Sequence, residues 1–98
     1  MDTLTSAVRA AMMGYTRKGL NSQSYLTHND DNTVFSVVTV TQKNTSFVSL
    51  LVRVSGETVI VEQDRNDKPL VDALLQAGVP RSQIILSYAG EPVPEASI

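Results

Sequence analysis

The chain has 98 residues, and ten acidic residues outnumber eight basic ones, which gives a net charge of −2 with histidine neutral. This length supports one domain with one core and excludes a separate catalytic domain. The absence of cysteine excludes disulfides and thiolate metal sites. The acidic balance disfavours direct binding to DNA or RNA without a partner, because nucleic-acid phosphates select a basic surface.

The N-terminus is acidic at Asp2, where a secretory signal would be basic and then strongly apolar. No apolar run approaches the length that crosses a membrane. The hydrophobic content of 42% with 18% charged residues is typical of a folded globular protein. We therefore expect a folded cytoplasmic protein with no membrane segment.

Residues 3–18 show the periodicity of an amphipathic helix. Apolar side chains recur on one face of that helix: Leu4, Val8, Ala11, Met12 and Tyr15. Asp2 or Thr3 can cap its start, because a short polar side chain accepts a hydrogen bond from a free backbone N–H. Gly19 is expected to end the helix in the left-handed conformation.

Between residues 24 and 63 the apolar period changes to two, which predicts strands. The expected strands cover residues 24–27, 33–41, 47–54 and 58–63, with polar turns at 28–32 and 42–46. A two-residue turn at positions 55 and 56 would pair Val52 with Val59. That register places six apolar residues on the core face of the sheet: Val48, Leu50, Val52, Val54, Val59 and Val61.

The other face of the same strands is less polar than a solvated face should be. Phe47, Leu51 and Ile60 are expected there, and Phe35 or Val37 would extend this surface. Two helices of this length can cover one face of a four-stranded sheet but hardly both. Either the chain termini half-bury the second face, or it meets another protein.

A second helix is expected after Asp67, which is placed to cap it, with Pro69 in the first turn where its missing N–H is harmless. Gly78 ends this helix. Its apolar stripe comprises Leu70, Val71, Leu74 and Leu75. Residues 81–83 are expected to form one tight helical turn, and the apolar run 84–86 is either a last strand or a packed extension.

These elements predict an α+β fold. It consists of an N-terminal helix, an antiparallel sheet of three to four strands, a second helix packed on the same sheet face and a short C-terminal apolar segment. Residues 1–90 are expected to form a single domain. Residues 91–98, with Pro92 and Pro94, are expected to form a loosely ordered tail.

The sequence carries few candidates for chemistry. His28 with Asp30 and Asp31 resembles a metal site only in composition, because the spacing fits no ligand loop, and a polar turn is favoured. The serines have only His28 as a base, and no nucleophile motif surrounds them. We therefore predict no catalytic, cofactor-binding or metal-binding residue, and no enzymatic activity.

A charged cluster at the junction of the last long strand and the second helix has two interpretations. It comprises Glu62, Asp64, Arg65, Asp67 and Lys68. These residues form either a recognition edge or a helix cap with a solvated loop, of which the cap is favoured. Arg53, on the second sheet face, is an interface candidate because arginine is enriched at interfaces, with simple exposure to solvent as an equal alternative.

The chain from Val59 onward combines a strand and polar turn at 59–64, a helix at 70–77, the tripeptide Gly78-Val79-Pro80 and an apolar run that ends at position 86. This order resembles the XisI family of fdxN element excision controlling factors, found largely in cyanobacteria. The upstream order of a helix and then hairpins also fits that family. Three places depart from its pattern: Gln63, where members often show arginine, Arg65-Asn66 and Tyr88-Ala89-Gly90.

The resemblance implies an accessory factor that controls programmed excision of a DNA element through contacts with an XisH-like companion protein. It brings no catalytic residue or cofactor, and a homo-oligomer is an open alternative. The residues that we expect at the partner interface come from the second sheet face and the charged cluster: Phe47, Leu51, Arg53, Ile60, Glu62, Asp64, Arg65, Asp67 and Lys68.

Two other hypotheses remain at this point. The first is a small-ligand or enzymatic module whose pocket is bounded by Arg53, Glu62 and Tyr88. The second is direct DNA binding, which would have a steep salt dependence. Four basic residues would carry it: Arg17, Lys18, Lys43 and Arg81.

Overall fold

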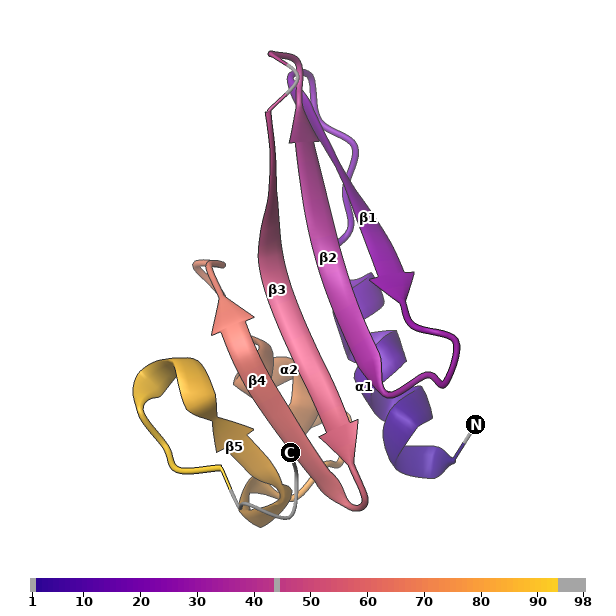
Figure 1. The fold of residues 1–98 in the computed structure, drawn as a ribbon, viewed down its shortest axis with the longest axis vertical. Helices are drawn as coiled ribbons and strands as arrows, with labels where there is room; N and C mark the ends of the chain where they lie inside the picture. The colour runs from indigo at the N-terminus through magenta and orange to yellow at the C-terminus, as the bar shows by residue number, and fades with distance from the viewer. Residues whose placement is uncertain (1, 44, 94–98) are drawn as a thin grey trace.

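A computed structural model describes residues 2–43 and 45–93 (Figure 1). The elements in chain order are α1 (Thr3–Met13), β1 (Ser22–His28), β2 (Val34–Thr41), β3 (Ser46–Ser55), β4 (Thr58–Asp64), α2 (Leu70–Gln76), the 3-10 turn η1 (Arg81–Gln83), β5 (Ile84–Leu86) and the 3-10 turn η2 (Ser87–Ala89). Asn44 in the expected turn 42–46 and residues 94–98 of the expected tail lie outside the described residues.

The strands form one sheet in the order β1-β2-β3-β4-β5, and both helices lie on the same side of it (Figure 1). The α+β class is confirmed. The expected count of three to four antiparallel strands is wrong, because Ile84–Leu86 forms a fifth strand parallel to β4. A parallel neighbour needs a crossover connection, and α2 with η1 supplies it.

Helix α1 begins as expected and ends five residues early. Asp2 caps it, with Oδ1 accepting a hydrogen bond from the Thr5 N–H at 2.7 Å. The helix ends at Met13 because Gly14, a weak helix former, follows and the chain leaves through a turn. The expected stop at Gly19 is therefore wrong. The apolar stripe is confirmed for Leu4, Val8, Ala11 and Met12, of which Val8 and Met12 are fully buried, while Tyr15 lies beyond the end of α1 and packs against the core.

The turn between β3 and β4 comprises Gly56 and Glu57, because Ser55 pairs with Thr58. Val54 therefore lies opposite Val59, and the predicted register is wrong by two residues. The faces are unchanged, since a shift of two preserves the alternation of side chains. Gly56 adopts a φ of 59°, which this tight turn requires.

A β-bulge in β3 overturns two predicted positions. Val37 pairs with Leu50 but Val38 pairs with Val48, so Ser49 is an extra residue. Its buried hydroxyl donates to the Val37 carbonyl at 3.2 Å. On the N-terminal side of this bulge, the side chains of β3 point to the opposite faces from those that strict alternation predicts. Val48 therefore lies on the face away from the helices, and Phe47 lies on the helix side.

The core between helices and sheet is built from α1, α2 and one face of β2, β3, β4 and β5. Its fully buried side chains are Val8, Met12, Phe35, Val37, Leu50, Val52, Val59, Val61, Leu70 and Leu74. Phe35 and Val37 thus belong to the core, and their predicted place on the second face is wrong. Leu75 was expected in the stripe of α2, but 43% of its surface is exposed.

The cap of α2 comes from a different residue than expected. The helix begins at Leu70 after Pro69, and the Leu70 N–H donates to Oδ2 of Asp64 at 2.7 Å. Oδ1 of Asp64 also accepts from the backbone N–H and the side-chain amide of Asn66. The predicted cap, Asp67, is exposed. Gly78, with a φ of 93°, ends the helix as predicted.

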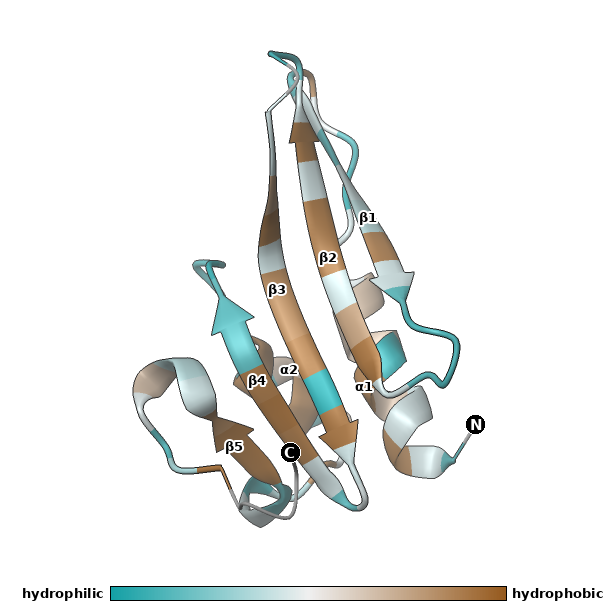
Figure 2. Ribbon diagram, viewed as in Figure 1, coloured by the Kyte–Doolittle hydropathy of each residue, from teal (hydrophilic) through white to brown (hydrophobic). Residues whose placement is uncertain are grey.

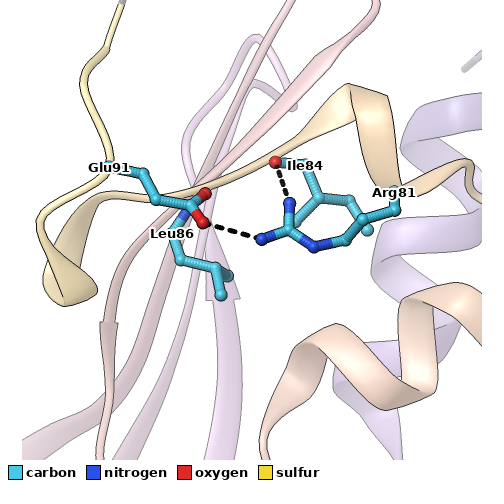
Figure 3. A network of polar contacts seen from close by, with 4 residues as sticks. All are labelled: Arg81, Ile84, Leu86 and Glu91. Carbon is cyan, nitrogen blue, oxygen red and sulfur yellow. Dashed lines mark hydrogen bonds and ion pairs between the residues drawn. The ribbon is translucent and has the colours of Figure 1, made fainter.

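A polar network fixes the chain after β5 (Figure 3). Arg81 donates to the Ile84 carbonyl and to Oε2 of Glu91, both at 2.7 Å, and Oε1 of Glu91 accepts from the Leu86 N–H at 2.8 Å. Glu91, which begins the expected tail, is thereby held against β5. The division into residues 1–90 and 91–98 stays a prediction.

Among residues 2–43 and 45–93, no helix combines the length and the apolar character that a membrane crossing needs.

Candidate functional site

The predicted interface residues separate into two groups on opposite sides of the sheet. Leu51, Arg53, Ile60 and Glu62 lie on the face away from the helices, while Phe47, Arg65, Asp67 and Lys68 line a cleft on the helix side. Asp64 belongs to neither group, because its carboxylate caps α2. The residues predicted as one partner interface therefore lie on two distinct surfaces.

We call the first surface the open face, because neither helix covers it (Figure 1). Residues that pair directly across neighbouring strands share a face of the sheet. Tyr25 and Val48 both pair with Val38, so all three lie on the open face. Its apolar members are Tyr25, Val34, Val38, Val40, Val48, Leu51, Ile60 and Ile85. Figure 2 shows apolar residues along most of β2 and β3, as expected where both faces of a strand are apolar.

Burial varies strongly across the open face. Ile60 is fully buried, and Leu51 is half-buried. Tyr25 and Val40, nearer the β1 edge, expose 48% and 39% of their surfaces. The accessible apolar part of this face therefore lies over β1 and β2.

Arg53 and Glu62 form an ion pair across β3 and β4 on the open face. Nε of Arg53 lies 2.6 Å from Oε2 of Glu62, and each side chain is about one quarter exposed (27% and 28%). Two opposite charges therefore lie together among the apolar side chains of the open face. The alternative hypothesis places a ligand pocket between Arg53, Glu62 and Tyr88, of which Tyr88 lies on η2. None of these three residues lines the cleft beside α1, the cleft at the β1–β2 edge or the cleft below the β4–α2 turn.

The second surface, which we call the basic cleft, has a volume of about 350 Å³ and lies where α1 ends beside the β4–α2 turn. Three cations, Arg17, Arg65 and Lys68, line it together with the carboxylate of Asp67. The rest of its lining is aromatic, hydroxyl-bearing or amide: Tyr15, Phe47, Ser22, Ser24, Thr39, Ser49 and Asn66.

Local structure brings these side chains together. The early end of α1 carries Tyr15 to the β4–α2 turn, where its hydroxyl donates to the Lys68 carbonyl at 2.9 Å. Burial, and then the charges of Asp64 and Asp72, raise the pKa of Tyr15 above 10.0. The bulge at Ser49 turns Phe47 toward the cleft, and the Arg65 guanidinium lies 4.7 Å from its ring centroid.

The loop from His28 to Asn32 is organised by Asn29. Its Oδ1 accepts from the N–H groups of Thr33 and Val34, at 2.9 and 3.0 Å. His28 packs at a tilt against Phe35, with the ring centroids 6.2 Å apart. Across residues 2–43 and 45–93, no three His, Asp or Glu side chains gather in a metal-binding arrangement.

The sequence could have shown the open face more completely. Residues 34–41 carry apolar side chains at consecutive as well as alternate positions, a pattern that buries both faces of a strand. That signal points to Val38 and Val40. Arg17 was considered only as a DNA contact, and nothing in the pattern joins it to Arg65, because they lie 48 positions apart.

The sequence matches the family model described as XisI protein over residues 4–96. Two crystal structures from Anabaena variabilis share the fold. The first is a XisI-like protein, with a TM-score of 0.62 at 15% sequence identity. The match covers 85% of this chain and 77% of the XisI-like chain. The other, fdxN element excision controlling factor XisI, has a TM-score of 0.60 at 17% identity, with coverage of 88% and 80%. Comparison with curated proteins gives no match.

Proposed function

This chain belongs to the XisI family, and we propose that it is a non-enzymatic accessory factor that controls excision of a DNA element by docking on an XisH-like companion protein. The open face carries the proposal. It carries apolar side chains at Val34, Val38 and Val40 of β2 and at Val48 and Leu51 of β3, and neither α1 nor α2 covers it. Surfaces of this kind on small domains mark protein contacts.

The composition of the open face suits an interface. Aromatic and arginine side chains are enriched where proteins meet, and the open face offers Tyr25 beside Val38 and Val40. The Arg53–Glu62 pair adds polar groups that can fix the orientation of a partner. Excess apolar surface would supply affinity, and the ion pair would supply specificity.

A regulatory role is more consistent with the relatives than a catalytic one, since the second structure is that of an excision controlling factor. The acidic balance of the chain favours action through protein contacts rather than through DNA. Arg81, one of four residues considered for DNA binding, is already bound to Glu91 and the Ile84 carbonyl.

The direct test is co-expression with an XisH-like protein encoded beside this chain, followed by co-purification. Val40→Lys combined with Tyr25→Lys adds two charges to accessible positions of the open face, so the fold should survive. We expect the affinity for the companion to fall at least about tenfold, because charge is excluded from the centre of an interface.

The matched control is Leu75→Lys combined with Gln76→Lys on exposed positions of α2, on the other side of the sheet. It adds the same charge and should leave binding unchanged. Equal weakening by both pairs, or a well-folded chain that ignores the companion, would overturn the proposal.

A further inference from the structure

We infer that the basic cleft binds the phosphate group of a small molecule of roughly mononucleotide size. The cleft lies on the helix side of the sheet, and the open face lies on the other. This site is therefore separate from the proposed partner surface and does not depend on it.

The charges of the cleft are unbalanced. Three of the eight basic residues of the chain line it, against the single carboxylate of Asp67. Within residues 2–43 and 45–93, the ion pairs join Arg53 to Glu62 and Arg81 to Glu91, so no cation of the cleft has a carboxylate partner there. Cations gathered in a concave surface repel one another and concentrate anions, although the whole chain is acidic.

Arg65 is held ready for an anion. Its backbone N–H donates to the Ser49 carbonyl at 2.9 Å, and its guanidinium stacks on Phe47 at 4.7 Å from the ring centroid. A guanidinium stacked by its face keeps the N–H groups of its edge available, and that edge matches two phosphate oxygens. The bulge at Ser49 contributes to this site, because it turns the Phe47 ring to the helix side, where the Arg65 guanidinium lies over it.

The walls of the cleft hold the main chain of two of its cationic residues. The Tyr15 hydroxyl binds the Lys68 carbonyl at 2.9 Å, and the Ser24 N–H binds the Arg17 carbonyl at 2.8 Å. The main chain of both cationic residues is therefore anchored across elements. Ser24 and Thr39 share a hydrogen bond of 3.0 Å, and each hydroxyl keeps capacity for one more.

The size and shape of the cleft favour a small ligand over a nucleic-acid duplex. Its volume of about 350 Å³ lies at the lower end of the range for small-molecule sites. A duplex requires an extended basic surface that neutralises many phosphates, whereas this chain is acidic overall. Several donors around one concavity suit a single phosphate with two negative charges.

The test titrates the full chain with inorganic phosphate, pyrophosphate, AMP and adenosine, and follows backbone amides by NMR together with calorimetry. We expect AMP and pyrophosphate to bind and adenosine not to bind. The amide shifts should centre on Ser24, Phe47 and Arg65.

Arg65→Gln combined with Lys68→Gln should weaken AMP binding at least about tenfold, because two charge-assisted contacts are lost. Arg9→Gln combined with Lys43→Gln removes the same charge from exposed positions outside the cleft lining and should leave AMP binding unchanged. Phe47→Leu should weaken AMP binding without a change in charge.

The inference is overturned if none of the phosphate probes binds at millimolar concentration. It is also overturned if the two charge-matched pairs weaken binding equally, or if only duplex DNA binds. The lysine substitutions on the open face separate this site from the proposed function, since they should leave AMP binding intact.

Discussion

The two faces of the sheet are both apolar, but they differ in what their side chains contact. On the helix face, Phe35, Val37 and Leu50 are fully buried against α1 and α2. On the open face, Tyr25 and Val40 expose 48% and 39% of their surfaces, although three of the four valines of β2 lie on this side. The helix face therefore holds most of the buried apolar side chains that stabilise the fold. The apolar side chains that stay accessible on the open face add little to this core, and it is to them that we assign a function.

The largest expected effect separates the two faces by stability. Leu74→Ala on the helix face should lower the free energy of unfolding by about 2–5 kcal/mol, because it leaves a cavity in a fully buried site. Leu51→Ala on the open face should cost only about 1 kcal/mol, since that side chain is half-buried. Urea denaturation measures both, and equal losses would remove the distinction between the faces.

The next effect concerns the junction between β4 and α2, where two aspartates lie three positions apart. Asp64→Ala should destabilise the chain by about 1–2 kcal/mol, because the Leu70 N–H loses its cap. Asp67→Ala, the matched control, should change stability by less than about 0.5 kcal/mol, since this carboxylate is exposed. The reverse order in thermal unfolding would restore Asp67 as the cap.

A smaller effect is expected from the ion pair of the open face. A double-mutant cycle with Arg53→Ala and Glu62→Ala should give a coupling of at most about 1 kcal/mol, because solvent screens a partly exposed pair. The same cycle measured on companion binding should give a larger coupling if the pair is enclosed by the partner. No coupling in either measurement would assign the pair no part in the interface.

The smallest effect is a dependence of stability on pH. Hydrogen bonding from the Leu86 N–H, and then from Arg81, lowers the pKa of Glu91 below its ordinary value of 4.5. The folded state thus holds the proton less tightly, so this contribution is present above pH 4.5 and is lost as pH falls through the folded pKa. Glu91→Gln should flatten the acid limb of the unfolding curve, and an unchanged limb would exclude Glu91.

Elements defined by periodicity were predictable from the sequence. The apolar stripe of α1, the hairpin strands and the end of α2 at Gly78 follow from the hydrophobicity and backbone preferences of the residues themselves. The parallel pairing of β5 was not predictable in the same way, because an apolar run of three residues is compatible with several packings.

The basic cleft and the cap of α2 depended on features that propensity does not reveal. The bulge at Ser49 adds one residue to β3 and reverses the faces of Phe47 and Val48. A strict alternation of two therefore placed Phe47 beside Leu51, whereas the structure places it beside Arg65. The cap from Asp64 required knowledge of how the chain turns after β4, since Asp67 has the better local spacing.

The most direct test of the account is a calorimetric titration of the XisH-like companion with two single variants. Val40→Lys and Leu75→Lys add the same charge at side chains of similar exposure, 39% and 43%, on opposite sides of the sheet. We predict that Val40→Lys weakens binding at least about fivefold while Leu75→Lys binds as the parent chain does. Weakening by Leu75→Lys alone would contradict the assignment of the open face.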